Sequence, residues 1–290
     1  MRRLLLILVL FLPLSALAAF DIKLVSRDDS NARYAIAMIR LALDKADVEY
    51  TLNISQGTLT AARQQQDTED GVIDIMWAAT TEDIESRLLP IRIPLYKGLL
   101  GHRVFIVHRD KRNLFAGIHR FEQLQGFVFG QGKGWPDTDI MRRNGLKVET
   151  GTYEGLFLMA DGQRFDAFPR GVNEPWSELQ ARPELELAVD EHLMFVYRMP
   201  FYLFVSPRQP ELARILEEGM LMAITDGSFD AQMMSDPMVQ MVVERGKLGQ
   251  RQIFELTNPD LPDATPLDNA ALWFDINSLR SPEEADESAE

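Results

Sequence analysis

The first half of the chain alternates between strand-like and helix-like patterns. Residues 20–26 alternate apolar and polar positions, as a half-buried strand does, and apolar residues then recur at helical spacing over 34–42. A second strand is predicted over 48–54, a Gln-rich polar helix over 60–67, and a buried strand over 72–76. This order of elements is typical of a largely parallel sheet.

The same alternation starts again after Arg109. Further strands are predicted over 127–129, 148–150, 185–189 and 201–205, and helices over 139–144, 152–160, 210–224 and 228–245. The chain leaves the first block near His102 to His108 and returns to it near Tyr202 to Pro207. We therefore predict an α/β fold of two lobes, each a mixed sheet flanked by helices, joined by a two-strand hinge. The cleft between such lobes is the default ligand site.

The N-terminus has the pattern of a secretory signal peptide. Arg2 and Arg3 precede an apolar core, and the small residues Ser15 to Ala18 suit a cleavage site, so residues 1–19 are assigned to the signal. An uncleaved anchor is the alternative. We expect lobe 1 to comprise 20–103 and 204–258, and lobe 2 to comprise 104–203. Residues 259–290 are rich in Pro and acids, and we expect a disordered tail there.

Charge and cysteine content narrow the classes of partner. Removing the signal leaves 28 of the 30 Lys and Arg against 44 Asp and Glu, so the formal net charge changes from −14 to −16. An acidic protein of this kind does not attract nucleic acid or an anionic membrane surface. The chain has no Cys, so disulfides and thiol catalysis are excluded and the lobes depend on their cores alone.

Signals for an enzyme are poor. The four His residues, His102, His108, His119 and His192, have no metal-ligand spacing, and no nucleophile elbow, Walker loop or His-Glu-x-x-His motif is present. We therefore expect neither a metal nor another cofactor, and an exported enzyme is the least favoured class.

Four segments together carry a family resemblance: IDIMWAATT (73–81), RLLPIRIPLYKG (87–98), VFGQGKG (128–134) and GQRFDAF (162–168). In order and spacing they resemble the type 2 periplasmic solute-binding family, in the branch related to the polar amino acid-binding proteins of ABC transporters (family 3-like). The resemblance covers residues 20–255. It implies two lobes that close over one small solute, a monomer, and delivery to an inner-membrane transporter.

Two positions depart from that family. An Arg that grips the substrate carboxylate stands about ten residues before the Pro-x-Tyr pair in the amino-acid binders, and here that place falls at Ile84, with Arg87 one turn later. In the same amino-acid binders, an acidic residue holds the substrate ammonium, and in this sequence Arg170 falls near the position of that acid. The resemblance therefore disfavours an α-amino acid and favours an anionic or carboxylate-bearing solute.

Three candidate ligand residues lie in the first lobe. Trp77 ends a strand, where its ring would stack on a solute or bridge strand and helix in the core. Thr80 offers a hydroxyl to a ligand or, like Thr81, a cap to the next helix. Tyr96 is either a cleft wall or a core residue.

The second lobe supplies the other candidates. Gln131, Lys133 and Trp135 lie in the Gly-rich loop 130–138, whose free N–H groups and helix N-terminus would suit a carboxylate or phosphate, although Gly is also common in plain turns. Arg170 would clamp an anion with its planar fork, or else pair with Glu174, itself a candidate at the rim.

The sequence thus predicts a periplasmic solute-binding protein that closes on a small polar, anionic or carboxylate-bearing solute for transport. A periplasmic sensor that binds the solute and docks onto a membrane receptor is the alternative, since it needs the same cleft.

Overall fold

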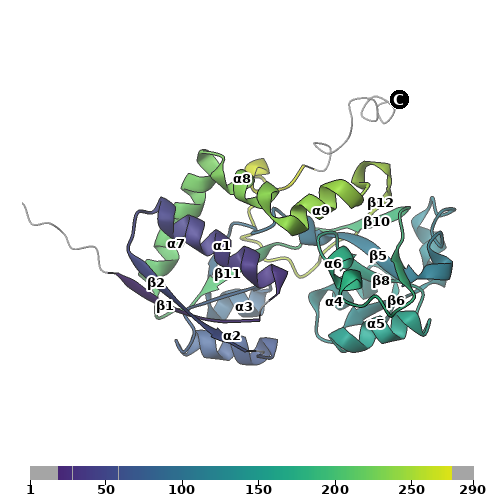
Figure 1. Ribbon diagram of the computed structural model, residues 1–290, viewed down its shortest axis with the longest axis horizontal. Coiled ribbons are helices and arrows are strands. Elements are labelled where there is room, and N and C mark those ends of the chain that lie inside the picture. The colour runs from purple at the N-terminus through teal and green to yellow at the C-terminus, as the bar shows by residue number, and fades with distance from the viewer. Residues whose placement is uncertain (1–18, 28, 58, 276–290) are drawn as a thin grey trace, which may run out of the picture.

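Two lobes lie side by side in the computed structural model, which describes residues 19–27, 29–57 and 59–275 (Figure 1). The purple and blue N-terminal part of the chain forms one lobe, and the teal central part forms the other. The residues predicted as a signal peptide lie outside the described part except for Ala19. No helix in the described ranges is long and apolar enough to cross a membrane.

Lobe 1 is built on two small sheets. In the first, β1 (Phe20–Ser26) pairs in parallel with β2 (Tyr50–Gln56). In the second, β11 (Phe201–Val205) lies between β3 (Ile75–Ala79) and β4 (Leu89–Ile91) and runs antiparallel to both. The predicted parallel pairing is therefore present in β1 and β2, whereas the returning strand β11 makes the lobe mixed.

The helices around lobe 1 include α1 (Ser30–Lys45), α2 (Ala61–Glu69), α3 (Glu82–Arg87) and α7 (Pro210–Thr225), and a later helix of residues 228–235 packs on α7 and α1. Helix α1 starts where the Asp29 side chain accepts a hydrogen bond from the Ala32 N–H at 2.9 Å. Its apolar face packs on α7 so closely that a Cβ at Gly219 would lie 1.9 Å from the carbonyl oxygen of Ala42. Glycine at 219 therefore sets the distance between the two helices.

Lobe 2 is built around the buried strand β5 (His102–His108). It pairs antiparallel with β8 (Phe168–Gly171), β9 (Leu187–Val189) and β10 (Leu193–Val196), and β12 (Gln252–Glu255) continues the sheet in parallel with β10. The sequence patterns predicted neither β10 nor β12. Strand β12 lies within the range expected for lobe 1, yet it pairs with the sheet of lobe 2, so the C-terminal part of the chain contacts both lobes.

A second, parallel pair of strands completes lobe 2. It consists of β6 (Val128–Gly132) and β7 (Lys147–Gly151), which are covered by α4 (Pro136–Arg143) and α5 (Tyr153–Asp161), while α6 (Pro175–Gln180) packs beside β9. Strand β6 includes residues 130–132, which the sequence predicted as loop. The short 3₁₀ helices of the structure are Leu99–Gly101, Arg109–Lys111, Phe121–Gly126, Leu248–Gln250 and Ala270–Leu272.

Two crossing segments, 92–101 and 197–200, join the lobes, and the chain crosses again between α7 of lobe 1 and β12 of the lobe 2 sheet. The two segments lie against each other, because the Tyr197 N–H donates to the Gly101 carbonyl at 3.0 Å and the Leu95 N–H donates to the Phe201 carbonyl at 2.9 Å. A Cβ at Gly101 would lie 1.9 Å from the Tyr197 carbonyl oxygen, so this close approach requires glycine. The predicted two-strand connection is thus present as a hydrogen-bonded pair of segments.

The single helix predicted over 228–245 is two helices, α8 (Ser228–Ser235) and α9 (Pro237–Arg245). Pro237 has no N–H to donate and its ring disfavours helix in the preceding residue, so the chain breaks at Asp236. The Asp236 side chain then accepts a hydrogen bond from the Met238 N–H at 2.9 Å and begins α9.

The disordered tail predicted from residue 259 differs from the structure up to residue 275. Leu272 and Trp273 are buried and join the main hydrophobic core. Composition suggested disorder because Pro and Asp dominate this stretch, but its apolar residues find a groove formed elsewhere in the chain. Residues 276–290 lie outside the described part.

The main core runs through both lobes and the crossing segments. Its centre in lobe 2 is aromatic: the Phe105 ring lies 5.0 Å from Phe115, 5.9 Å from Phe129 and 4.8 Å from Phe195, measured between centroids. Such contacts add to the free energy gained from burying the rings. Without disulfides, these packed cores hold each lobe in shape.

Candidate functional site

A cavity of about 850 Å³ lies between the two lobes. Lobe 1 contributes the start of α1, the end of β3 and Phe201, while lobe 2 contributes Arg103, Arg170 and residues of α4 and α6. Its charged lining residues are Arg27, Arg33, Arg103, Arg170 and Arg182 with Asp29, Asp137, Glu174 and Glu178. A cleft of this size, lined from two bodies, is the usual place for a small ligand.

Trp77 and Phe201 bring apolar surface to the lobe 1 side of the cavity. Trp77 lies on β3, which is held in register by β11, with Leu203 opposite it. The indole is partly buried and packs against the main core, while part of it lines the cavity. Both interpretations of Trp77 therefore apply together, as core residue and as cleft wall.

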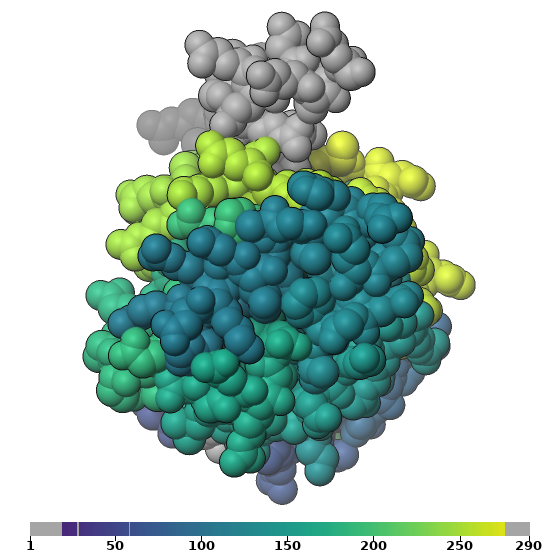
Figure 2. Space-filling view, turned by 90° about the vertical axis from the view of Figure 1, so that its right-hand side faces the viewer, coloured from purple at the N-terminus to yellow at the C-terminus, as the bar shows by residue number. Residues whose placement is uncertain are grey.

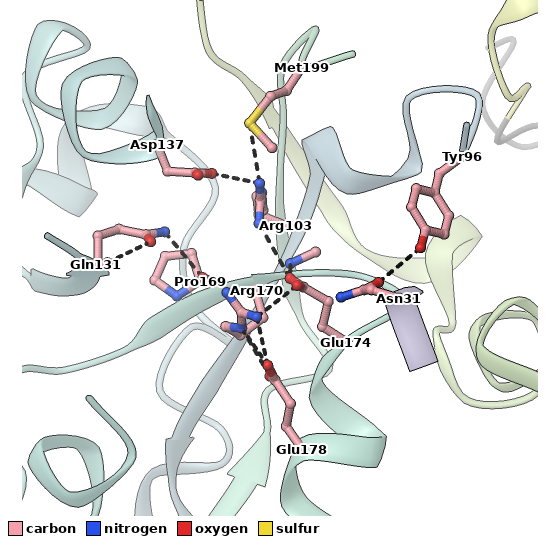
Figure 3. Close-up of polar contacts among 12 residues, drawn as sticks. Asn31, Tyr96, Arg103, Gln131, Asp137, Pro169, Arg170, Glu174, Glu178 and Met199 are labelled. Atoms are coloured by element: carbon pink, nitrogen blue, oxygen red, sulfur yellow. Dashed lines mark hydrogen bonds and ion pairs between the residues drawn. The ribbon is translucent and has the colours of Figure 1, made fainter. Parts of the chain in front are cut away.

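Arg170 lies on β8 and is 4% exposed, in a cluster of charged side chains at the back of the cleft (Figure 3). Its Nη2 donates to Glu174 Oε1 at 2.7 Å, and its Nε donates to Glu178 Oε2 at 2.9 Å. The guanidinium also lies 5.0 Å from the ring centre of Trp135. Arg170 is thus paired with acids, as one of the two sequence interpretations expected, and it also lines the cavity.

Burial and the neighbouring charges in this cluster change the pKa values of Arg170 and Glu174. Burial alone would lower the pKa of Arg170, but the carboxylates of Glu174 and Glu178 outweigh it, so its pKa is raised. Burial raises the pKa of Glu174, against the attraction of Arg170, and the neighbouring charge of Glu178 adds to the rise. Glu174 is therefore a carboxyl group whose ionisation costs free energy in the folded protein.

Arg103 is a member of this cluster that the sequence analysis did not identify. It is 3% exposed on β5, and its Nη2 lies 2.7 Å from Asp137 Oδ1 while its Nη1 lies 3.6 Å from Glu174 Oε2. The Tyr197 hydroxyl donates to the same Asp137 oxygen. Arginine directly before the apolar residues 104–107 of this strand was the available signal, because a charge on a buried strand needs a partner.

Glu174 links the two arginines. Its Oε1 accepts from Arg170, and its Oε2 accepts from the Gly171 N–H at 2.7 Å and faces Arg103. With all groups ionised, the cluster contains the guanidiniums of Arg103 and Arg170 and the carboxylates of Asp137, Glu174 and Glu178. One negative charge is therefore in excess, and Glu174, whose pKa is raised, is the group on which a proton would relieve it.

Thr80 and Tyr96 lie beside the cleft without lining it. The Thr80 hydroxyl donates to Glu85 Oε1 at 2.6 Å, and Thr80 lines a neighbouring cavity of about 500 Å³ that Trp135 also borders. Tyr96 is 1% exposed and stacks on Tyr34, and its hydroxyl donates to Asn31 Oδ1 at 3.0 Å. Asn31 does line the cleft, so Tyr96 supports it from behind.

Gln131 and Lys133 line neither the cavity between the lobes nor the neighbouring cavity beside Thr80. Gln131 is fully buried on β6, where its Nε2 donates to the Pro169 carbonyl at 3.2 Å, and Lys133 is exposed. The nearby glycines make room for aromatic rings, because a Cβ at Gly132 would lie 2.1 Å from Trp135 and one at Gly130 would lie 2.3 Å from Phe165. The space beside these two glycines is therefore occupied by side chains of the protein itself.

Trp135 precedes α4 and borders both cavities. The backbone N–H of Trp135 donates to the Gly132 carbonyl at 3.0 Å, and the backbone N–H of Lys133 donates to the Gly151 carbonyl at 3.0 Å. Two N–H groups of the predicted anion-binding loop are thus already used within the protein. The indole of Trp135, more than the backbone of this loop, faces the cleft.

The family resemblance placed a carboxylate-gripping Arg near Ile84, and the structure shows where Ile84 and Arg87 lie. Ile84 lies on α3 and packs against the small cluster around Tyr202 and Phe204. Arg87 turns toward α2, where its Nε donates to Glu69 Oε2 at 2.8 Å. Neither residue lines the cavity between the lobes. Among the described residues, no group of three or more His, Cys, Asp or Glu is placed to hold a metal ion.

Comparison with known proteins identifies the fold. No protein-family model and no curated protein sequence matches this chain. An ancestral arginine-binding protein bound to arginine matches 75% of this chain and 98% of its own, with 14% identity and a TM-score of 0.53. The VFT2 domain of BvgS from Bordetella pertussis, a double mutant, matches 75% of this chain and 93% of its own, with 13% identity and a TM-score of 0.58.

A histidine kinase sensor domain with similarity to periplasmic binding proteins matches 76% of this chain and 96% of its own, with 12% identity and a TM-score of 0.54. Identities this low establish the fold and nothing finer. The chain has the two-lobed, periplasmic-binding-protein-like α/β fold, which confirms the predicted fold class and, at the level of fold, the resemblance that predicted it.

Proposed function

We propose that this chain is an extracytoplasmic solute-binding protein whose lobes close over a small polar solute with an anionic or carboxylate group. The observation that carries the proposal is the cavity of about 850 Å³ lined by charged and aromatic side chains of both lobes. Closure of the lobes would remove the solute from water, which strengthens every polar contact that it makes.

The charges around the cleft support an anionic group on the solute. Five arginines and four acids line the cavity, whereas the whole chain has 30 basic and 44 acidic residues. The cleft is thus richer in positive charge than the rest of the chain. Arginine is suited to bidentate recognition of carboxylates.

Arg170 is the proposed clamp, although it is paired with acids in this structure. Glu174 holds Arg170 Nη2, and burial raises the pKa of Glu174. A solute carboxylate would take over the contact with Nη2, and Glu174 would take up a proton. Trp77 and Trp135 would then supply the walls on either side of the solute.

The proposed setting is the periplasm, with the chain delivering its solute to an inner-membrane transporter. An arginine-binding protein of the same fold supports a role in binding small solutes. The second candidate is a periplasmic sensor that docks onto a membrane receptor, and the similarity to a histidine kinase sensor domain supports it. Co-purification of membrane partners from the native cell separates the two roles.

The first test is a thermal-shift screen of organic acids and amino acids, followed by calorimetry with the best hit. Trp77→Ala should weaken binding by about five- to thirtyfold, because it removes a stacking surface worth on the order of 1–2 kcal/mol. Arg170→Lys, which keeps a charge but loses the fork, should also weaken binding. Arg164→Ala changes an exposed arginine and is the matched control.

Three outcomes would count against the proposal. Unchanged solute affinity in Arg170→Lys and in Arg170→Ala would show that Arg170 does not clamp the solute. A screen in which cationic compounds bind and organic acids do not would reverse the proposed charge of the solute. Turnover of a hit, in place of saturable binding, would favour an exported enzyme.

A further inference from the structure

Residues 257–274, here called the strap, run across the crossing segments that join the two lobes. The Asn258 Nδ2 donates to the Arg198 carbonyl at 2.9 Å, in the returning segment. The Phe274 N–H donates to the Lys97 carbonyl at 2.7 Å, in the outgoing segment. The strap is therefore hydrogen-bonded to the outgoing and the returning crossing segments.

Trp273 makes the most specific contact of the strap. It is 8% exposed, and its ring covers Gly98, where a Cβ would lie 2.7 Å from Trp273 Cε3. Gly98 has a φ of +79°, which other residues adopt with strain. The Arg198 guanidinium lies 4.8 Å from the centre of the same ring. One indole thus contacts both crossing segments.

The strap is fixed at its two ends and folded between them. At its start, Asn144 of lobe 2 exchanges hydrogen bonds with the Thr257 backbone at 2.8 Å and 3.1 Å. Near its end, the Trp273 Nε1 donates to the Pro266 carbonyl at 3.0 Å. It reaches lobe 1 through Lys97, whose side chain forms an ion pair with Asp230 of α8.

The strap and the cleft use different residues of the returning segment. Met199 and Phe201 line the cavity, whereas Arg198 contacts the strap. Side chains of an extended segment alternate between its two sides, so the strap lies behind the crossing and the cleft lies in front of it. Figure 1 shows the yellow strap between the lobes, and Figure 2 shows yellow residues along the upper and right-hand edge of the teal lobe 2.

We propose that the strap is a conformational device that sets the equilibrium between the arrangements of the two lobes. A hinge movement changes the backbone angles of the crossing segments, and the strap holds those angles through Trp273, Asn258 and the Phe274 N–H. Trp273 is thus a positioning residue, which changes solute affinity without touching the solute. This inference rests on the proposed closure of the lobes.

The test measures the distance between the lobes directly and needs no solute. The chain has no Cys, so Ala62→Cys on α2 and Glu149→Cys on β7, both exposed, provide two unique labelling sites on different lobes. Spin or fluorescent labels at this pair report the distribution of lobe separations in the full chain. Trp273→Ala is the test variant, and Leu267→Ala, which truncates an exposed residue of the same strap, is the matched control.

We expect Trp273→Ala to broaden or shift the distribution of separations, and Leu267→Ala to leave it unchanged. Arg198→Met, which removes the charge over the indole and keeps the packing, guards against loss of folding and should give a smaller shift in the same direction. A distribution that is unchanged in both Trp273→Ala and Arg198→Met would overturn the proposal.

A separate experiment measures the affinity for a solute. With a solute from the screen, Trp273→Ala should change the affinity by the factor by which the population of the closing-competent state changes. If no solute binds and the separations still shift, the proposed function fails and the strap proposal stands.

Discussion

At the scale of single residues, the buried charged side chains of the cleft lie beside partners of opposite charge. Arg103 and Arg170 are buried on neighbouring strands, and Glu174 touches both. Removing one member would leave another charge buried and unpaired, which costs on the order of 3–5 kcal/mol. Variants of this cluster therefore need a folding control before any change in solute affinity is interpreted.

His102 should make the stability of the protein depend on pH. Burial lowers the pKa of His102 to about 4, and the Gly98 carbonyl, 3.2 Å from Nδ1, opposes this in part. Because an unfolded histidine binds its proton near pH 6.5, the unfolded chain is favoured as the pH falls below that value. The free energy of unfolding should decrease between pH 6.5 and pH 4, by up to about 3 kcal/mol.

Urea unfolding at pH 7, 5.5 and 4.5 measures this dependence. His102→Asn should have a flatter pH profile than the natural protein over this window, since it removes the titrating group. The same substitution at the exposed His119 is the matched control and should keep the natural slope. Equal slopes in all three proteins would show that His102 does not carry the effect.

At the scale of elements, close approach decides which helices and strands pack together. Gly219 lets α7 touch α1, and Gly101 lets the two crossing segments touch each other. Neither requirement is visible in a hydrophobic pattern, which marks the buried face of an element but not the partner that covers it. The break between α8 and α9, in contrast, could be predicted from Pro237 alone.

Gly219→Ala should destabilise the protein by about 1–3 kcal/mol, because the added Cβ overlaps the Ala42 carbonyl and the two helices must separate. Gly117→Ala is the control, since a Cβ there meets nothing within 4 Å. Urea midpoints of both variants give the comparison. A Gly219→Ala protein as stable as the natural one would mean that α1 and α7 move apart at little cost.

At the scale of the whole molecule, two lobes share one core and two crossing segments, and the cleft lies between them. The proposed function requires that this arrangement changes when a solute binds. We expect the radius of gyration from small-angle X-ray scattering to decrease at a saturating concentration of the best solute, because closure brings the lobes together. Trp77→Ala should need more solute for the same decrease.

The control for this measurement is a compound that gives no thermal shift, which should leave the scattering unchanged. A bound solute without any decrease in the radius of gyration would contradict closure of the lobes, while leaving binding itself intact.

The sequence by itself determined the fold class of this protein and some of the residues that line the cleft. Alternating strand and helix periods report which faces are buried, and this information is local, so β1, α1 and β2 lie close to where the pattern predicted them. Trp77, Trp135, Arg170 and Glu174 were chosen from strand ends together with the family resemblance, and they line the cavity between the lobes. The other candidates, Thr80, Tyr96, Gln131 and Lys133, do not line it.

The tertiary structure alone decided which partners these residues take. Arg170 meets Glu178 as well as Glu174, Arg103 joins them from another strand, and Trp135 and Phe165 fill the space left by two glycines. The ALWF segment (271–274) lies in a stretch with the composition of an acidic tail, and only the tertiary structure places its Trp273 against Gly98 and Arg198. Contacts between distant residues depend on how the elements pack, and a pattern of single positions does not contain that information.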